Sequence, residues 1–110
     1  MFNRGGASTA LQQSVTRTLL KFCEDHQYPD DGLAEVRQCL KSLKRGDVSS
    51  AIQSYRKVPL GGRMGYFDEW IPPVRFSNET EDYVSTLFAV LVAQWREVME
   101  SIARLQSDEN

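Results

Sequence analysis

Two adjacent carboxylates, Asp68 and Glu69, lie between Arg63 and Arg75 in a stretch that is also rich in aromatic residues. Paired carboxylates can act as general acid and base when burial moves their pKa values apart. Solvated salt bridges on a loop are the more ordinary explanation of such charges, and sequence alone does not show burial. The aromatic residues that could wall a pocket beside these charges are Tyr66, Phe67 and Trp70.

The residues just before this stretch are rich in glycine, with Gly61, Gly62 and Gly65 within five positions. Bare backbone amides can surround a phosphate, but a P-loop ends in Lys-Ser/Thr, and a dinucleotide loop joins a strand to a helix. Neither feature is present, because Tyr66 follows the glycines and no strand pattern precedes them. The segment therefore favours a sharp turn anchored by aromatic side chains.

Cys23 and the single histidine, His26, are three residues apart and could share one helical face. A Cys–His nucleophile also needs hydrogen-bonding contact and a third, orienting group, which two side chains of one helix rarely achieve. A histidine near the carboxyl end of a helix is explained by the helix dipole. One histidine and two separated cysteines do not make a metal-ligand set. We therefore expect no catalytic residues, no metal and no cofactor, and lean against an enzyme.

The only basic cluster of the chain is too small to indicate a nucleic-acid-binding protein. The formal net charge is -2 and the pI is about 5.4, whereas nucleic-acid binders usually carry a basic excess. A solvated helix end is the simpler explanation of the cluster. Its members are Lys41, Lys44, Arg45, Arg56 and Lys57.

The last third of the chain contains the longest predicted helix. Seven apolar residues follow one another at alternating steps of four and three, which predicts one helical stripe ending near Gln106. Three flanking residues, Leu87, Val92 and Met99, widen the stripe into a face that contacts several partners. The seven ladder residues are Val84, Phe88, Leu91, Trp95, Val98, Ile102 and Leu105.

Three shorter helices are predicted before it, with ends near Asp25, Gly46 and Pro59. Gly46 is the expected left-handed stop of the second helix. The expected amino-terminal caps, in order along all four helices, are Ser8 or Thr9, Asp30 or Asp31, Asp47, and Asn78 in a capping box with Glu81. The residues expected to face the core are Leu11, Val15, Leu19, Phe22 and Cys23, then Leu33, Val36, Leu40 and Leu43, then Val48, Ala51, Ile52 and Tyr55.

Residues 59–77 contain three prolines and three glycines and cannot form a regular helix. Three aromatic residues within five positions would be costly to leave in water, so we expect an ordered loop packed on the helices. The predicted fold is therefore all-α: one bundle-like domain of four helices, residues 1–110, with this loop before the last and longest helix. Residues 1–7 and 107–110 are expected to be flexible.

Residues 60–69, Leu-Gly-Gly-Arg-Met-Gly-Tyr-Phe-Asp-Glu, resemble a loop of small uncharacterised bacterial proteins. Those proteins often have Gly-Gly-Met-Gly-Ser-Phe-Asn-Asp at this point. The present chain differs by the inserted Arg63, by Tyr66 in place of serine and by Asp68 in place of asparagine. The resemblance implies a bacterial, helical protein in which this loop matters, and it implies no activity.

The function we expect is protein–protein contact, with a second copy or another protein as partner. The broad apolar face of the last helix favours a twofold homodimer. The alternative is a small-molecule binder or minor enzyme with its pocket at the loop, and the direction of the loop's aromatic side chains distinguishes the two. Without a secretory signal or a long apolar span, and with two cysteines, a cytoplasmic protein without membrane contact is expected.

Overall fold

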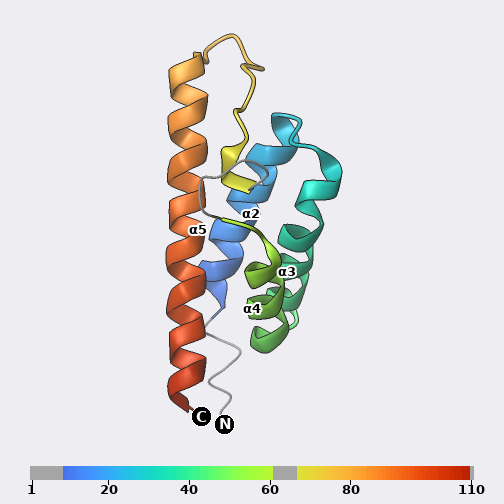
Figure 1. Ribbon diagram of the computed structural model, residues 1–110, viewed down its shortest axis with the longest axis vertical. Coiled ribbons are helices and arrows are strands. Elements are labelled where there is room, and N and C mark those ends of the chain that lie inside the picture. Colours follow the sequence, from blue (N-terminus) through green and yellow to red (C-terminus); the bar gives the residue numbers. More distant parts are fainter. Residues whose placement is uncertain (1–8, 61–66, 110) are drawn as a thin grey trace.

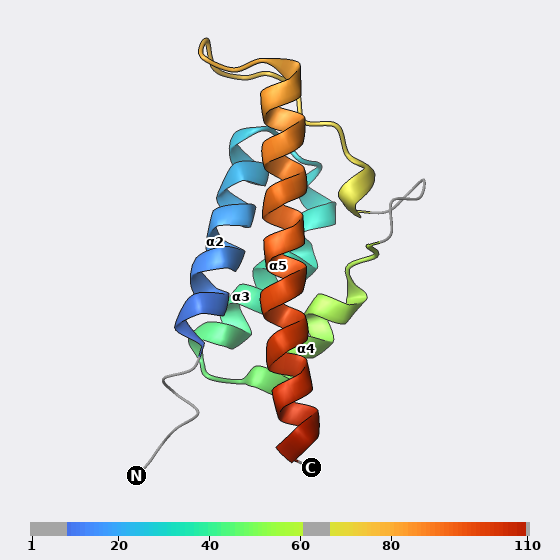
Figure 2. The ribbon, with the colours of Figure 1, turned by 90° about the vertical axis from the view of Figure 1, so that its left-hand side faces the viewer.

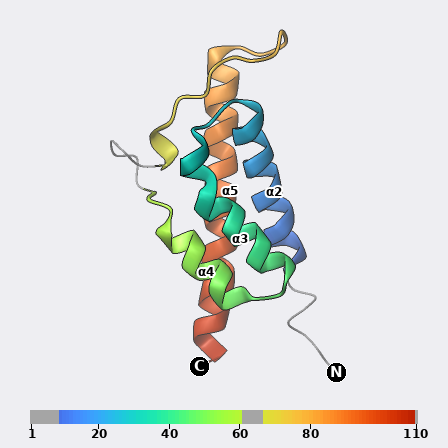
Figure 3. The same cartoon turned by 90° about the vertical axis from the view of Figure 1, so that its right-hand side faces the viewer.

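The computed structural model describes residues 9–60 and 67–109, and within these ranges it is helical, with no strand. Four α-helices and two short 3-10 helices follow one another as α2 (Ala10–Asp25), η1 (Asp30–Leu33), α3 (Ala34–Lys44), α4 (Val48–Lys57), η2 (Phe67–Glu69) and α5 (Glu81–Glu109). α5 runs along the long axis of the molecule, antiparallel to α2. α3 packs on α2, and α4 packs on α3 and α5 (Figures 1 and 3). The predicted all-α, bundle-like fold with the longest helix last is confirmed.

The turn between α3 and α4 forms as its residues predict. Gly46 has a φ of +75°, a conformation that costs other residues free energy because of their Cβ atom. Asp47 then caps α4, since its Oδ1 accepts a hydrogen bond of 3.1 Å from the backbone N–H of Ser50. Hydrogen bonds from Ser50 also lower the pKa of Asp47. Short polar side chains and glycine thus set this turn locally.

Two of the predicted caps are wrong. α5 begins at Glu81 rather than after Asn78, and Thr80 caps it by accepting 3.1 Å from the N–H of Tyr83. Neither Asp30 nor Asp31 caps α3, because the chain makes η1 first and α3 begins at Ala34. In both places the α-helix begins two or three residues later than the nearest Asx signal suggests. At its other end α5 continues to Glu109, past the predicted end.

A third predicted cap, Thr9, bonds to a neighbouring helix instead of capping its own helix. Thr9 stands at the start of α2, but its hydroxyl donates to the carbonyl oxygen of Leu43 on α3, at 3.3 Å. Gln13 Nε2 donates 2.9 Å to the Thr9 hydroxyl and supports the same contact. Thr9 therefore joins the start of α2 to the end of α3. Ser8, the alternative cap, lies outside the described residues.

The ladder of α5 forms the core over most of its length and leaves it at the carboxyl end. Val98 is only half-buried, and Leu105 is 64% exposed, so Leu105 does not belong to the core of the single chain. A 3.5-residue repeat on a helix of 3.6 residues per turn drifts by about 20° per heptad, and three heptads turn Leu105 away from the core. Met99 and Ala103 take its place there. The buried members of the ladder are Val84, Phe88, Leu91, Trp95 and Ile102.

The core-facing side of α2 is more polar than the pattern predicts. Leu11 is 60% exposed, whereas Gln12 and Thr16 are buried. Thr16 is buried with its hydrogen bonds satisfied, because its hydroxyl donates to the Gln12 carbonyl at 2.6 Å and accepts 3.0 Å from the indole N–H of Trp95. The apolar residues of α2, α3 and α4 that do fill the core are Leu19, Leu20, Phe22, Cys23, Val36, Cys39, Leu40, Leu43, Ala51, Ile52 and Tyr55.

Candidate functional site

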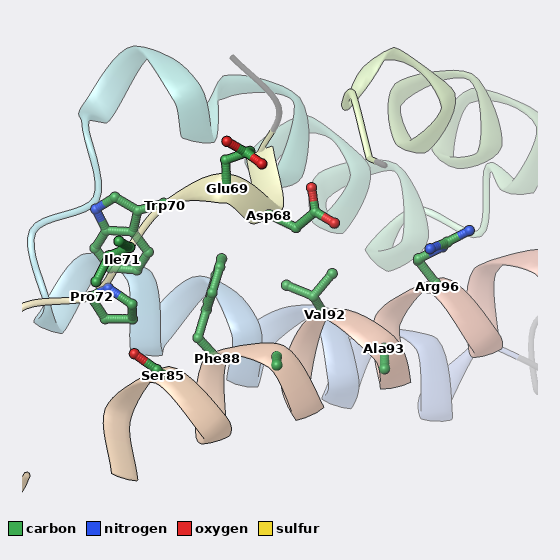
Figure 4. A pocket seen from close by; sticks show the side chains of 11 residues that line it. Asp68, Glu69, Trp70, Ile71, Pro72, Ser85, Phe88, Val92, Ala93 and Arg96 are labelled. Carbon is green, nitrogen blue, oxygen red and sulfur yellow. The ribbon is translucent and has the colours of Figure 1, made fainter. Parts of the chain in front are cut away.

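A groove of about 420 Å³ lies between α5 and the segment from η2 to Pro72. This volume falls within the range of small-molecule sites, about 300–1,000 Å³. Figure 4 shows Phe88 and Val92 on the α5 side pointing toward Asp68 and Trp70 on the other side. The lining residues are Asp68, Glu69, Trp70, Ile71, Pro72, Ser85, Phe88, Ala89, Val92, Ala93 and Arg96.

Phe67 fixes the wall of this groove to the core. Its side chain is 3% exposed, and its ring lies 5.8 Å from that of Phe88 and 6.4 Å from that of Trp95. Its backbone is held from two sides: its N–H donates 2.8 Å to the Pro59 carbonyl, and its carbonyl accepts 3.0 Å from the Tyr28 hydroxyl. The next two residues, both acidic, are therefore held at the rim of the groove.

Trp70 belongs both to the core and to the groove. It is half-buried, packs edge-on against Phe88 with ring centres 5.1 Å apart, and lies 4.6 Å from the ring of Tyr28. It also lines the groove. Of the two predicted roles for the loop's aromatic residues, core packing and pocket wall, Phe67 has the first and Trp70 contributes to the wall of the groove. Tyr66 lies outside the described residues.

Charges of both signs meet in the groove. Asp68 and Glu69 of η2 and Arg96 of α5 are among its lining residues, and Figure 4 shows the Glu69 side chain pointing away from α5. Arg96 also faces Tyr55, whose hydroxyl donates 2.8 Å to Glu100. Burial raises the pKa of Tyr55 to about 12, the Glu100 carboxylate adds to this, and Arg96 opposes it. Tyr55 therefore remains a neutral hydrogen-bond donor. The groove offers charged groups above an apolar floor.

The structure brings together some of the predicted site residues and not others. Asp68, Glu69 and Trp70 line one groove, as predicted, whereas Arg75 is not among its lining residues. Arg63 lies outside the described residues, as do the glycines considered for phosphate binding and most of the segment that carries the resemblance. Sequence reasoning missed Arg96. A signal was available, because Ser85, Ala89 and Ala93 are small residues at four-residue steps that lead toward it.

A second polar constellation, missed by the sequence, joins His26 and Glu79. The His26 side chain is 4% exposed and the Glu79 side chain 7%. His26 Nδ1 lies 2.9 Å from the Phe22 carbonyl oxygen, and Nε2 lies 2.9 Å from Glu79 Oε2. Both partners are hydrogen-bond acceptors, so each contact is a hydrogen bond when the ring nitrogen concerned carries its hydrogen. The Phe22 ring stacks on the imidazole at 4.1 Å.

Glu79 closes the segment that leads into α5. One of its oxygens, Oε1, accepts hydrogen bonds from the backbone N–H of Arg75 at 3.1 Å and of Phe76 at 3.2 Å. Through His26, the same carboxylate is tied to the end of α2. This junction explains why a segment with two prolines is held in one path between the groove and α5.

Cys23 does not form a nucleophilic pair with His26. Its side chain is fully buried, and burial, with a smaller contribution from the charge of Glu24, raises the pKa of its thiol to about 12. The reactive thiolate is therefore scarce at neutral pH. Both ring nitrogens of His26 are bonded elsewhere.

Acid is expected to weaken the His26–Glu79 junction. Burial alone raises the pKa of Glu79, but hydrogen bonds from the Arg75 amide, His26 and the Phe76 amide outweigh it and lower the pKa below the ordinary 4.5. Such a carboxylate stabilises the fold above its unfolded pKa, and that stabilisation is lost as the pH falls through the folded pKa. Glu79→Gln should therefore lower the free energy of unfolding at about pH 6, and this difference should shrink below about pH 4.

Urea melts of the unsubstituted chain and the Glu79→Gln variant between about pH 6 and pH 3 measure this effect. Glu69→Gln is the matched control, because Glu69 is exposed and its substitution should change stability little at any of these pH values. A deficit in Glu79→Gln that stays constant over the range would show that its charge does not support the junction.

The basic cluster of the sequence lies on the surface of α3 and α4. The five residues of the basic cluster are all exposed along α3 and α4 and at their ends. Among residues 9–60 and 67–109, no group of three or more metal-ligating side chains comes together, and no helix could span a membrane.

The fold and the groove define an all-α, bundle-like domain with a half-open cavity beside its longest helix. No family model matches the chain, and searches of curated proteins and of solved structures also found no match.

Proposed function

We propose that this protein acts through protein–protein contact, and that its partner is a second copy that docks antiparallel on the outward face of α5. The observation that carries the proposal is the length of α5 that no other element among residues 9–60 and 67–109 covers. α5 packs mainly on α2 and α4, and Figure 2 shows its outer side open along the whole helix. Twenty-nine helical residues extend for about 44 Å, which offers a long surface for a helix pair.

The middle of this outward face carries small side chains. Thr86, Val90 and Ala93 are exposed on neighbouring turns, and Val90 is 46% exposed. Small residues allow two helices to approach closely, and the apolar surface that leaves water on pairing supplies the driving force. Association therefore uses a different face from the ladder, most of which is already buried within one copy.

The charges on the same face are arranged for an antiparallel partner. Asp82 and Arg104 are exposed and lie at equal sequence distances on either side of Ala93, about three helical turns away. A twofold axis near Ala93 brings Asp82 opposite the partner's Arg104, and symmetry makes this pair twice. A parallel pair would instead bring like charges together, which selects the antiparallel arrangement.

We also propose that the protein is cytoplasmic and bacterial. Cys23 and Cys39 are free and buried, and burial raises the pKa of both thiols to about 12, which suits a reducing compartment. The bacterial origin is supported by the resemblance of residues 60–69 to the loop of small bacterial proteins.

Sedimentation equilibrium at micromolar concentrations is expected to give twice the chain mass of 12.5 kDa. Arg104→Glu should weaken association about tenfold or more, because it replaces two attractive contacts with two repulsive ones. The double variant Asp82→Lys with Arg104→Glu restores opposite charges and should recover the dimer. Lys57→Glu is the control, since it makes the same charge change on an exposed residue of α4.

A mass of 12.5 kDa at every concentration would overturn the proposal. So would a dimer that Arg104→Glu leaves unchanged, because the partner would then occupy another face.

A further inference from the structure

We propose that the second copy covers two exposed apolar pairs, one at each end of α5. The amino-end pair is Phe76 and Tyr83, and the carboxyl-end pair is Leu11 and Leu105. In the antiparallel dimer, the amino-end pair of each copy docks on the carboxyl-end pair of the other. This inference rests on the proposed self-association and deepens it, because it names the apolar contacts at the ends of the interface and the buried junction that positions one of them.

All four side chains are accessible in the single chain. Phe76 is 48% exposed, Tyr83 52%, Leu11 60% and Leu105 64%. Single exposed apolar residues are ordinary on protein surfaces, so exposure alone does not define a contact. Here the two pairs occupy opposite ends of the helix that we propose pairs with its copy, and an antiparallel twofold brings opposite ends together.

The amino-end pair is held in place before any partner binds. Phe76 is tied to Glu79 twice: its N–H donates 3.2 Å to Oε1, and its carbonyl accepts 3.0 Å from the N–H of Glu79. The Phe76 ring meets the imidazole of His26 edge-on at 5.6 Å, so one side of the ring is fixed while about half of the residue faces water. Figure 2 shows this turn extending from the start of α5, which carries Tyr83, to the side where α2 ends. Docking on a preordered pair costs little conformational entropy.

The carboxyl-end pair lies where the start of α2 runs beside the end of α5 (Figure 1). The hydrogen bond of 3.0 Å from the indole of Trp95 to Thr16 fixes how these two antiparallel helices are aligned. Leu11 lies about 8 Å before Thr16, and Leu105 lies about 15 Å beyond Trp95, both toward the same end of the molecule. Two exposed leucines from different helices therefore mark this end of the interface.

The spacing along α5 places the two pairs opposite each other. Leu105 follows Tyr83 by about six full helical turns, so both side chains project from one side of α5. Asp82 and Arg104 directly precede these residues and have the same separation. A twofold axis that brings Asp82 opposite the partner's Arg104 therefore brings Tyr83 within about 3 Å, measured along the helix axis, of the partner's Leu105. Symmetry makes this apolar contact twice, beside the two ion pairs.

Cysteine cross-linking tests this arrangement. Tyr83→Cys and Leu105→Cys are made as separate variants, mixed in equal amounts and treated with a short bismaleimide. A cross-linked dimer is expected in the mixture and in neither variant alone, because identical positions lie about 30 Å apart or more in the antiparallel dimer. The unsubstituted chain is the control and should not cross-link, because burial raises the pKa of the thiols of Cys23 and Cys39 to about 12 and leaves little thiolate.

Sedimentation equilibrium on the same samples separates the two ways in which the inference can fail. A mass of 12.5 kDa at every concentration would remove the dimer itself, and this inference with it. A dimer that cross-links within single variants, or whose mixture does not cross-link, would leave self-association standing and overturn the docking of the two pairs.

The apolar contacts are tested through the dissociation constant of the dimer. Phe76→Ala and Leu105→Ala should each weaken the dimer about fivefold or more, because each removes two apolar contacts per dimer. Ile71→Ala is the matched control, since Ile71 is more exposed than either residue but lies in the lining of the groove, and it should leave the dissociation constant unchanged. In the dissociated chain, Leu105→Ala should not change the free energy of unfolding, because the leucine is exposed there.

Glu79→Gln should also weaken the dimer at neutral pH, by about threefold, because it loosens the hold on Phe76. In the Phe76→Ala background the same substitution should have no further effect, which separates the positioning of Phe76 from a general loss of stability. Circular dichroism confirms that each variant is folded at the concentrations used. An equal effect of Glu79→Gln in both backgrounds would overturn the part assigned to the junction.

Discussion

Replacing Trp95 by alanine is expected to lower the free energy of unfolding by about 3–5 kcal/mol, the range for truncating a buried aromatic residue. Trp95 is fully buried, and its indole N–H donates 3.0 Å to the Thr16 hydroxyl of α2. Its ring meets that of Tyr55 of α4 edge-on at 5.1 Å and lies 6.4 Å from that of Phe67 of η2. One side chain of α5 therefore contacts two helices and the wall of the groove, and its loss leaves a cavity between all of them.

Urea melts of Trp95→Ala measure this loss directly. Trp95→Phe is the matched comparison, because it keeps an aromatic ring and removes the N–H that Thr16 accepts; about 1–3 kcal/mol is expected. Leu105→Ala serves as the control on the same helix, since Leu105 is 64% exposed and should change stability by less than about 0.5 kcal/mol. A loss below about 1 kcal/mol for Trp95→Ala would contradict the packing described here.

Phe67→Ala is expected to lower the free energy of unfolding by about 3–5 kcal/mol, and Trp70→Ala by a smaller amount, above about 2 kcal/mol. Phe67 is almost fully buried and contacts the rings of Phe88, Trp95 and Tyr28. Trp70 is half-buried, so its removal exposes less new apolar surface to water. If both values are large, the loop is part of the core; if both variants are as stable as the unsubstituted chain, the loop is not anchored there.

Ile71→Ala is the control for these melts, because Ile71 follows Trp70 directly and is 79% exposed. A large loss of stability for Ile71→Ala would mean that the whole segment, rather than its anchored rings, supports the fold.

Short-range signals were sufficient for several elements of this protein. The alternating spacing of apolar residues predicts α5, because a helix brings every third and fourth residue to one side. Gly46 and Asp47 predict the turn before α4, since a positive φ and an amino-terminal cap involve only neighbouring residues. Part of the site was also predictable, because Asp68, Glu69 and Trp70 are close in sequence and remain together in the fold.

Features that depend on distant residues could not be predicted in this way. His26 and Glu79 are far apart in sequence, and only the packing of α2 beside the start of α5 makes them a buried pair. Arg96 enters the groove because η2 lies against the middle of α5. No local sequence pattern links such residues to their distant partners, since side-chain contacts between elements arise from tertiary packing.

By itself, the sequence determined the helical class, the order and approximate lengths of the helices, and which residues are apolar enough to form a core. These properties follow from periodicity and from turn residues, which act within a few positions of the chain. The tertiary structure alone decided that Leu11 and Leu105 stay exposed, that Thr16 is buried beneath Trp95, and that a groove opens beside α5. The physical reason is that a helix can carry apolar or small residues on several sides, and the elements that pack against it decide which side is buried.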